Sequence, residues 1–246
     1  MAEPARFFCD DLPAPGLSEP ATVTLDPDES RHARKVLRLG PGNAVTLFDG
    51  RGRIAVAELT DHAAPRAVCR VVSVREVPRP RPRLTVFAAT PKGGRAEAMV
   101  DQLAQLGADA WRPLASARSV VEPGANKRRR LAAAALAAAK QSGRAWAMDV
   151  GGAIGFDAAL REPAETRLIL DPIGGGDDPR LNNFRGESVV LLIGPEGGWT
   201  DDERAAAAAA GWRPWRIAPH VLRIETAATA ATALVRYLAG DTPPDP

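Results

Sequence analysis

The amino-acid sequence predicts an α/β fold with a mostly parallel sheet, preceded by a small, mostly β unit. From Leu84 onward, short apolar runs alternate with helix-like segments, and repeated βα units of this kind build parallel sheets covered on both faces. Before residue 77, short runs alternate instead with turn signals such as Gly40-Pro-Gly42 and Asp49-Gly50, which indicates strands joined by turns.

The first 76 residues are expected to form the β unit. Its predicted strands are short apolar or β-branched runs at 21–25, 44–48, 54–59 and 67–74. After the first of them, Asp26-Pro27-Asp28-Glu29 predicts a helix start, with an N-cap residue, a proline at the first helical position and an acidic first turn. We expect this helix to continue to Leu39.

One face of this predicted helix is basic. Its positive residues fall at positions i, i+3, i+4 and i+7, namely Arg31, Arg34, Lys35 and Arg38. His32, Val36 and Leu39 line another face, which can pack on the β unit. A basic face is usually only solvated surface, but it becomes a candidate for RNA phosphate contacts where the rest of the chain indicates an RNA partner.

The segment Val77-Pro-Arg-Pro-Arg-Pro-Arg83 predicts a domain boundary. Alternating prolines favour a stiff, extended spacer without ladder hydrogen bonds. We therefore expect domains at 1–76 and 84–240, joined by a linker at 77–83 and followed by a tail at 241–246.

Strands and helices alternate in the second predicted domain. The expected strands are 84–88, 110–114, 146–150, 167–171 and 189–193. Helices are expected at 95–106, where Gly107 closes the helix, and at 127–140, where a basic cluster opens it. A glycine loop at 174–176 precedes the strand that begins at Val189.

The most informative stretch is Ser188–Glu203. Five aliphatic residues, Val189–Ile193, end at a Gly-Pro pair and predict a strand buried on both faces. Thr200 and Glu203 form a capping box, worth roughly 1 kcal/mol, which opens an alanine-rich helix ending at Gly211. The glycines between them let backbone groups approach a flat ligand closely, although glycine content alone leaves a ligand-free turn equally open.

Composition excludes several classes of protein. Hydrophobic residues at 45% and charged residues at 25% are typical of globular domains, and no stretch predicts a membrane span or signal peptide, so we expect a cytoplasmic protein. The two cysteines and three histidines are scattered, so neither a metal site nor a disulfide framework is expected. The formal net charge is only +2, and the positive charge is carried mainly by arginine. Arginine suits phosphate contacts, but its abundance also follows from a GC-rich genome.

Two motifs together resemble a known family. Ile193-Gly-Pro-Glu-Gly-Gly198 and Leu222-Arg-Ile-Glu-Thr-Ala227, which leads into a helix ending near Gly240, are similar to the signature of bacterial 16S ribosomal RNA uridine-N3 methyltransferases, of the SPOUT (trefoil-knot) superfamily. Further similar segments are 91–95, 105–107, 118–121 and 140–144. The resemblance implies a trefoil-knotted, mostly parallel sheet with an N-terminal PUA-like or OB-like β-barrel. General topology rules alone would not predict a knot.

The resemblance also implies a cofactor, S-adenosylmethionine, bound in a bent shape by three loops. The residues implied to bind it are Leu170, Ile193, Gly194, Pro195, Glu196, Gly197, Gly198, Ile217, Val221, Leu222, Arg223, Thr226 and Ala227. An adenine ring needs an apolar slot with a few backbone hydrogen bonds, which the aliphatic members and the glycine amides of this set can supply. The helix that starts near Thr226 offers unpaired N–H groups to a polar group of a ligand.

The implied reaction is methyl transfer to N3 of a uridine in 16S (small-subunit) ribosomal RNA. N3 is neutral at physiological pH and must lose its proton, so the site needs a base or a cation that favours the anion. Glu196 and Arg223 are the candidates for catalysis, and the alternative is that they form a salt bridge that joins the two loops. Glu225 is expected to complement a helix N-terminus.

Basic residues at family positions are expected to contact the RNA together with the predicted basic helix face. These residues are Lys92, Arg95, Arg118 and Arg144. The resemblance further implies a homodimer that forms through the knot domain, without a metal or a membrane partner.

Some positions depart from the family pattern, and other functions stay open. Ile217-Ala-Pro-His220 lacks a usual glycine and arginine, Gln102 and Gln105 replace charged residues, and Ala117 replaces a glutamate. Alternatives are a SPOUT ribose 2′-O-methyltransferase acting on transfer or ribosomal RNA, or a catalytically silent RNA-binding protein. A nicotinamide-dependent oxidoreductase is excluded because Gly151-Gly-Ala-Ile-Gly155 lacks the required glycine spacing.

Overall fold

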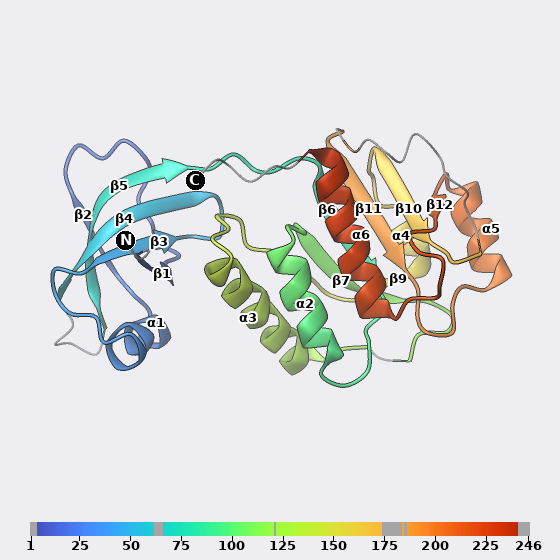
Figure 1. The fold of residues 1–246 in the computed structure, drawn as a ribbon, viewed down its shortest axis with the longest axis horizontal. Coiled ribbons are helices and arrows are strands. Elements are labelled where there is room, and N and C mark those ends of the chain that lie inside the picture. The colour runs from blue at the N-terminus through green and yellow to red at the C-terminus, as the bar shows by residue number, and fades with distance from the viewer. Residues whose placement is uncertain (1–3, 62–65, 121, 174–183, 185, 241–246) are drawn as a thin grey trace. The chain divides into compact units, whose positions relative to one another are not determined.

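The computed structural model describes residues 4–61, 66–120, 122–173, 184 and 186–240 (Figure 1). These residues divide into two compact units, which are described separately. The first unit contains the residues up to Arg79 together with Ala139–Ala147, and the second contains Pro80–Ala138 and the residues from Met148 onward. Within the described ranges, no helix combines the length and the apolar character needed to cross a membrane.

A five-stranded mixed sheet forms the first unit. Its strands are β1 (Ala5–Phe8), β2 (Ala21–Thr24), β3 (Ala44–Phe48), β4 (Arg53–Asp61) and β5 (Val68–Glu76). They lie in the order β1-β3-β4-β5-β2, in which β1 and β3 pair in parallel and the other pairs are antiparallel. The four strands predicted from the sequence are present. The sequence does not predict β1.

The predicted helix start in this unit is confirmed, but its predicted end is wrong. The Asp26 carboxylate accepts hydrogen bonds from the backbone N–H groups of Asp28 and Glu29, both at 2.8 Å, at the start of α1 (Pro27–Arg31). A π-helical turn, η1 (His32–Val36), follows. The helix stops at Val36 because Arg38 takes the left-handed conformation, with φ at +54°.

The π-helical turn also changes which side chains pack on the sheet. The Leu37 N–H donates to the His32 carbonyl at 3.0 Å, one residue further back than in an α-helix. Val36, which was expected to pack on the β unit, is therefore 63% exposed. The His32 ring lies edge-on to Phe7, with 6.0 Å between ring centroids, and Leu39 packs against the core as predicted.

Residues 139–147 join the first unit through specific contacts. Two carbonyl groups, those of Gly143 and Arg144, accept hydrogen bonds from the Arg6 guanidinium at 2.8 and 2.5 Å. The Lys140 ammonium donates to both oxygens of Glu29, at 3.0 and 2.8 Å. The Trp146 indole N–H donates to the Val77 carbonyl at 3.0 Å. The end of helix α3 (Ala125–Gln141) and the residues that follow it, up to Ala147, therefore belong to the first unit.

A parallel sheet forms the second unit. Its strands are β6 (Arg83–Ala88), β7 (Ala110–Ala115), β8 (Asp149–Val150), β9 (Ile154–Gly155), β10 (Thr166–Leu170), β11 (Ser188–Ile193) and β12 (Arg213–Trp215). The order is β12-β10-β11-β6-β7-β8, and β9 also pairs with β7. Every described pair in this sheet is parallel. The predicted parallel sheet is therefore confirmed.

Among the described residues, four helices lie in the second unit, and a fifth, α3, begins there and ends in the first. They are α2 (Arg95–Gln105), α3 (Ala125–Gln141), α4 (Phe156–Leu160), α5 (Asp201–Ala209) and α6 (Ile224–Ala239). The sequence does not predict β9, α4 or β12, which have five residues or fewer. The strand expected at 146–150 contains only Asp149 and Val150, because Trp146 pairs with Arg51 in the first unit. The glycine loop at 174–176 and the tail at 241–246 lie outside the described residues.

The strands of the second unit bury side chains on both faces. Val86 and Leu191 belong to an apolar layer that also contains residues of α2, α3 and α6. Phe87 and Leu192 belong to a second layer with residues of α4 and α5. Helices α2 and α6 lie side by side against the first of these faces (Figure 1). Burial on both faces explains why these strands are continuous apolar runs.

A buried ion pair fixes the C-terminal end of α6. The Arg236 guanidinium donates to the Asp109 carboxylate at 3.0 Å and to the carbonyls of Pro82 and Gly107 at 2.8 and 2.5 Å. The same Asp109 oxygen accepts the Leu84 N–H at 2.8 Å. Because both charges are almost fully buried, removing either partner would leave the other uncompensated. The position of α6 against β6 therefore depends on this pair.

The buried thiol of Cys69 gives the first unit a pH-dependent stability. Burial raises the pKa of this thiol from 9.0 to about 11. A folded-state pKa above the unfolded value stabilises the protein fully below about pH 9, and this contribution is lost as the pH rises through 11. Between these values we expect chemical denaturation to report a loss on the order of 2 kcal/mol that is absent from Cys69→Ala. Identical pH profiles for the two proteins would exclude this role.

Candidate active site

A pocket lies at the carboxyl edge of the parallel sheet, where β10, β11 and β12 end. Three segments line it: Leu170–Pro172 after β10, Ile193–Trp199 after β11, and Trp215–Ala227, which connects β12 to α6. Ligands of open α/β sheets bind at this edge because the loops that follow parallel strands meet there. The lining combines aliphatic side chains with the backbone of a glycine-rich loop.

The loop after β11 has its path fixed by Trp199. This side chain is 2% exposed, and its indole N–H donates to the Leu170 carbonyl at 2.8 Å. A Cβ atom at Gly194 would lie 2.9 Å from the indole ring, so the ring leaves room only for glycine there. The Gly198 N–H closes a turn on the Pro195 carbonyl at 2.8 Å, and Gly198 itself has φ at +68°.

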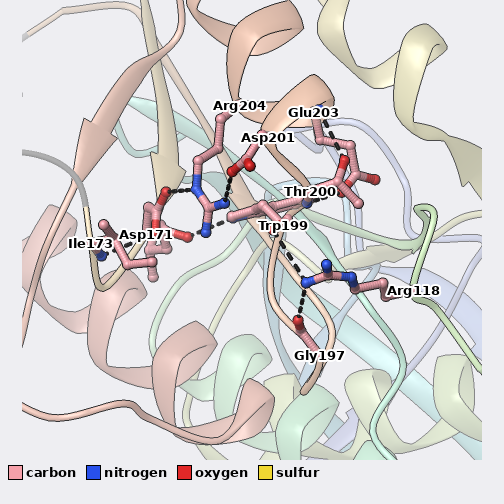
Figure 2. Close-up of polar contacts among 10 residues, drawn as sticks. Arg118, Asp171, Ile173, Gly197, Trp199, Thr200, Asp201, Glu203 and Arg204 are labelled. Carbon is pink, nitrogen blue, oxygen red and sulfur yellow. Dashed lines mark hydrogen bonds and ion pairs between the residues drawn. The ribbon is translucent and has the colours of Figure 1, made fainter.

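Arg118 holds this loop, and Arg204 joins the end of β10 to α5 (Figure 2). The Arg118 guanidinium donates to the carbonyls of Gly197 and Trp199 at 2.7 and 3.4 Å. The Arg204 guanidinium donates to Asp171 at 2.7 Å and to Asp201 at 3.1 Å. The hydrogen bond with Asp171 raises the pKa of Arg204, which therefore stays charged. The end of β10 is thus joined to α5.

The predicted capping box at the start of α5 is confirmed. The Glu203 N–H donates to the Thr200 hydroxyl at 3.1 Å, and the Thr200 N–H donates back to the Glu203 carboxylate at 2.9 Å (Figure 2). The other Glu203 oxygen accepts the Ala117 N–H at 2.8 Å. Glu203 therefore caps the helix and also ties it to the segment that carries Arg118.

A charged cluster lies beside the pocket. The Arg95 guanidinium lies 3.6 Å from Glu196 and 3.2 Å from Glu225, and Arg95 also donates to the Lys92 carbonyl at 3.3 Å. The salt bridge between Glu196 and Arg223, one of the two interpretations from the sequence, does not form. Among the described residues, the exposed Arg223 side chain has no ion pair or hydrogen bond, so both it and one Glu196 oxygen are open to a ligand.

Most of the residues that the resemblance implies for cofactor binding line this pocket. Those that do so are Leu170, Ile193, Gly194, Pro195, Glu196, Gly198, Ile217, Val221, Leu222 and Ala227. Gly197 lies in the loop after β11, Arg223 is the N-cap of α6 and Thr226 lies in its first turn, and none of the three lines the pocket. Sequence reasoning omits other lining residues, namely Asp171, Pro172, Trp199, Trp215, Arg216, Ala218, His220 and Ile224. Trp199 could have been included in the predicted site because it directly follows the glycine loop in the sequence.

The basic residues expected to contact RNA are divided between the two units. The first unit holds Arg31, Arg34, Lys35, Arg38 and Arg144, and the second holds Lys92, Arg95 and Arg118. Lys92, Lys35 and Arg38 are exposed, whereas Arg34 and Arg144 are partly buried. Arg118 donates hydrogen bonds to the loop after β11, and Arg95 belongs to the charged cluster beside the pocket.

No metal-binding arrangement is found in the ranges that the structure describes: no three His, Cys, Asp or Glu side chains gather in a way that could hold an ion. Both cysteines are buried and unpaired.

Comparison with known proteins identifies the family. The model of the RNA methyltransferase domain matches residues 78–236, and that of the RNA methyltransferase PUA domain matches residues 25–72. The chain is 35% identical to ribosomal RNA small subunit methyltransferase E of Mycobacterium bovis over 247 residues, which cover 94% of this chain and 91% of the relative. It belongs to the ribosomal RNA small subunit methyltransferase E family. The Synechocystis member is 34% identical over 227 residues, 89% of this chain and 74% of the relative.

Solved structures of similar proteins agree with this assignment. The methyltransferase E of Neisseria gonorrhoeae, bound to S-adenosylmethionine, superposes with a TM-score of 0.85 and 30% identity over 96% of this chain and 98% of that one. A Legionella pneumophila methyltransferase in complex with the same cofactor gives 0.83 and 28%, with the same coverage. The predicted fold class, a SPOUT α/β domain preceded by a PUA domain, is confirmed for this methyltransferase.

Replacement of Gly194 by alanine tests whether Trp199 fixes the pocket loop of this methyltransferase. The added Cβ would overlap a buried ring that its hydrogen bond to Leu170 prevents from moving, so we expect a loss of about 2 kcal/mol in the free energy of unfolding. Gly152→Ala is the matched control, because a Cβ there meets no atom within 4 Å. Equal urea midpoints for the two variants would show that the ring shifts freely.

Proposed function

We propose that this protein transfers a methyl group from S-adenosylmethionine to N3 of a uridine in small-subunit ribosomal RNA, in the cytoplasm. The observation that carries the proposal is the pocket built by three loops at the carboxyl edge of the parallel sheet, with Glu196 in its lining. Family membership and the cofactor bound to the Neisseria gonorrhoeae relative support it.

The residues of the pocket fit this cofactor. Aliphatic side chains, among them Leu170, Ile193 and Leu222, provide an apolar slot for an adenine ring. The glycine loop between Gly194 and Gly198 presents backbone donors and acceptors, which provide specificity without bulk. When bound, the cofactor supplies an electrophilic methyl group on a sulfonium. The loop holds its shape through Trp199 and Arg118.

We propose that Glu196 and Arg223 assist the proton transfer that the acceptor nitrogen requires. We assign Glu196 as the group that accepts the N3 proton, because its carboxylate lines the pocket and is partly open to solvent. Arg95, at 3.6 Å, positions that carboxylate from the side of α2. Arg223 begins α6 with an exposed guanidinium, which suits stabilisation of a uridine anion or a neighbouring phosphate.

We also infer that two copies of the chain associate through the second unit. Ile173 and Val221 are aliphatic but 80% and 78% exposed, and Val221 lies on the rim of the pocket. A second copy that covered them would remove this apolar surface from water.

Light scattering should report a mass of about twice 26.0 kDa, with Val221→Asp shifting it toward the monomer. A monomeric wild-type protein would reject the dimer.

Substitution of Glu196 tests the proposed reaction. Glu196→Gln keeps the shape of the side chain and removes the base, so we expect kcat to fall roughly 100-fold while the Kd for S-adenosylmethionine changes by less than about threefold. Turnover is measured with small ribosomal subunits lacking the modification, and calorimetry gives the Kd. The exposed Glu19→Gln, in the first unit and outside the pocket segments, is the matched control.

Mass spectrometry of the nucleosides distinguishes this reaction from its rivals. N3-methyluridine in the product supports the proposal, whereas a 2′-O-methylated nucleoside would replace it with ribose methylation. Calorimetry that detects no cofactor binding, together with intact RNA binding, would leave only an RNA-binding role.

A further inference from the structure

Four consecutive residues at the end of the π-helical turn form an exposed surface that we name the tip: Lys35, Val36, Leu37 and Arg38. Val36 is 63% exposed and Leu37 is 41% exposed. Single exposed aliphatic residues are ordinary, but two neighbours at a turn, with a cation on each side, form a small apolar surface within a positive field. The proposed catalytic site uses none of these residues.

The backbone of the tip is unusual in two ways. It leaves a π-helical turn, a conformation that is rare and is often found at functional positions. It then places Arg38 at φ +54°, where a side chain costs roughly 1 kcal/mol and glycine costs nothing. A residue whose conformation favours glycine thus carries a long cationic side chain, which points to a use for that side chain.

The charges of the tip are free for a partner. In the described parts of the chain, neither Lys35 nor Arg38 makes an ion pair or a side-chain hydrogen bond. By contrast, the nearby Arg31 pairs with Asp28. Two unpaired cations therefore flank the aliphatic pair.

We propose that the tip binds RNA at an unstacked nucleotide. Val36 and Leu37 pack against the face of an exposed base or ribose, and Lys35 and Arg38 contact the phosphates on either side. RNA rather than a lipid surface is favoured because sequence-specific RNA recognition targets loops and bulges with splayed bases, and the RNA methyltransferase PUA model covers these residues. Aliphatic wedges beside cations are also known from proteins that unstack nucleic-acid bases. The inference rests on the proposed function, which makes ribosomal RNA the substrate.

Binding measurements on the full chain separate the aliphatic and the cationic contributions. Fluorescence anisotropy with labelled small-subunit ribosomal RNA should give a Kd about tenfold weaker for the double variant Val36→Ser/Leu37→Ser, with an unchanged salt dependence, because only apolar contacts are lost. Lys35→Ala should lower the slope of log Kd against log salt by about one, the value for one phosphate contact. The double variant Val56→Ser/Val72→Ser is the control, because these valines are each 53% exposed elsewhere in the same unit.

Substitution of Arg38 separates its side chain from its backbone. Arg38→Gly suits the left-handed conformation, so the melting temperature should stay equal or rise while RNA binding weakens as much as in Arg38→Ala. If Arg38→Gly binds RNA like the wild type, the side chain has no role there and the proposal fails.

Further outcomes keep this proposal distinct from the proposed function. If the wild type methylates the RNA but the Val36→Ser/Leu37→Ser variant binds it as well as the control does, the tip proposal alone is overturned. If the wild type neither binds nor methylates the RNA, the proposed function fails too. Binding of the tip to anionic phospholipid vesicles, lost in the same variant while RNA binding is unchanged, would overturn the choice of RNA as the partner.

Discussion

The pocket depends on one contact, the hydrogen bond from the buried Trp199 indole to the Leu170 carbonyl. This bond joins the end of β10 to the loop that follows β11, and the ring that makes it leaves room only for the hydrogen atom of glycine at position 194. With Trp199 fixed, Arg118 can hold the outer carbonyls of the loop and Glu203 can cap the following helix (Figure 2). A glycine-rich segment, flexible by composition, thus has one conformation.

Long elements with strong local signals could be predicted from the sequence. The run Val189–Ile193 is buried on both faces, and the caps at Asp26 and Thr200 have the predicted hydrogen bonds. Short elements without such a signal could not, because three residues such as those of β12 show no period. The end of the first helix at Val36 follows from the left-handed Arg38 after a π-helical turn, and side-chain spacing encodes neither feature.

The site shows a similar division. Its loops were predictable because the two motifs that resemble the family lie on them. The partner of Glu196 was not, since Arg95 comes from α2 and also pairs with Glu225, 130 positions further along the chain. Arg118 was predicted as an RNA contact from the family resemblance, but the structure shows its guanidinium on the loop carbonyls, a role that only the fold assigns. Electrostatic pairing between distant segments is set by topology, and one sequence does not reveal it.

The assignment of residues 139–147 to the first unit has a practical meaning for limited proteolysis. A fragment that ends in the proline-rich linker would lack Lys140, the carbonyl groups that Arg6 binds and the Trp146 indole that bonds to Val77. A protease that nicks the chain once near Pro80 would therefore produce two pieces that stay associated without a covalent link. The N-terminal piece, expressed alone, would lack the contacts that residues 139–147 make with the first unit.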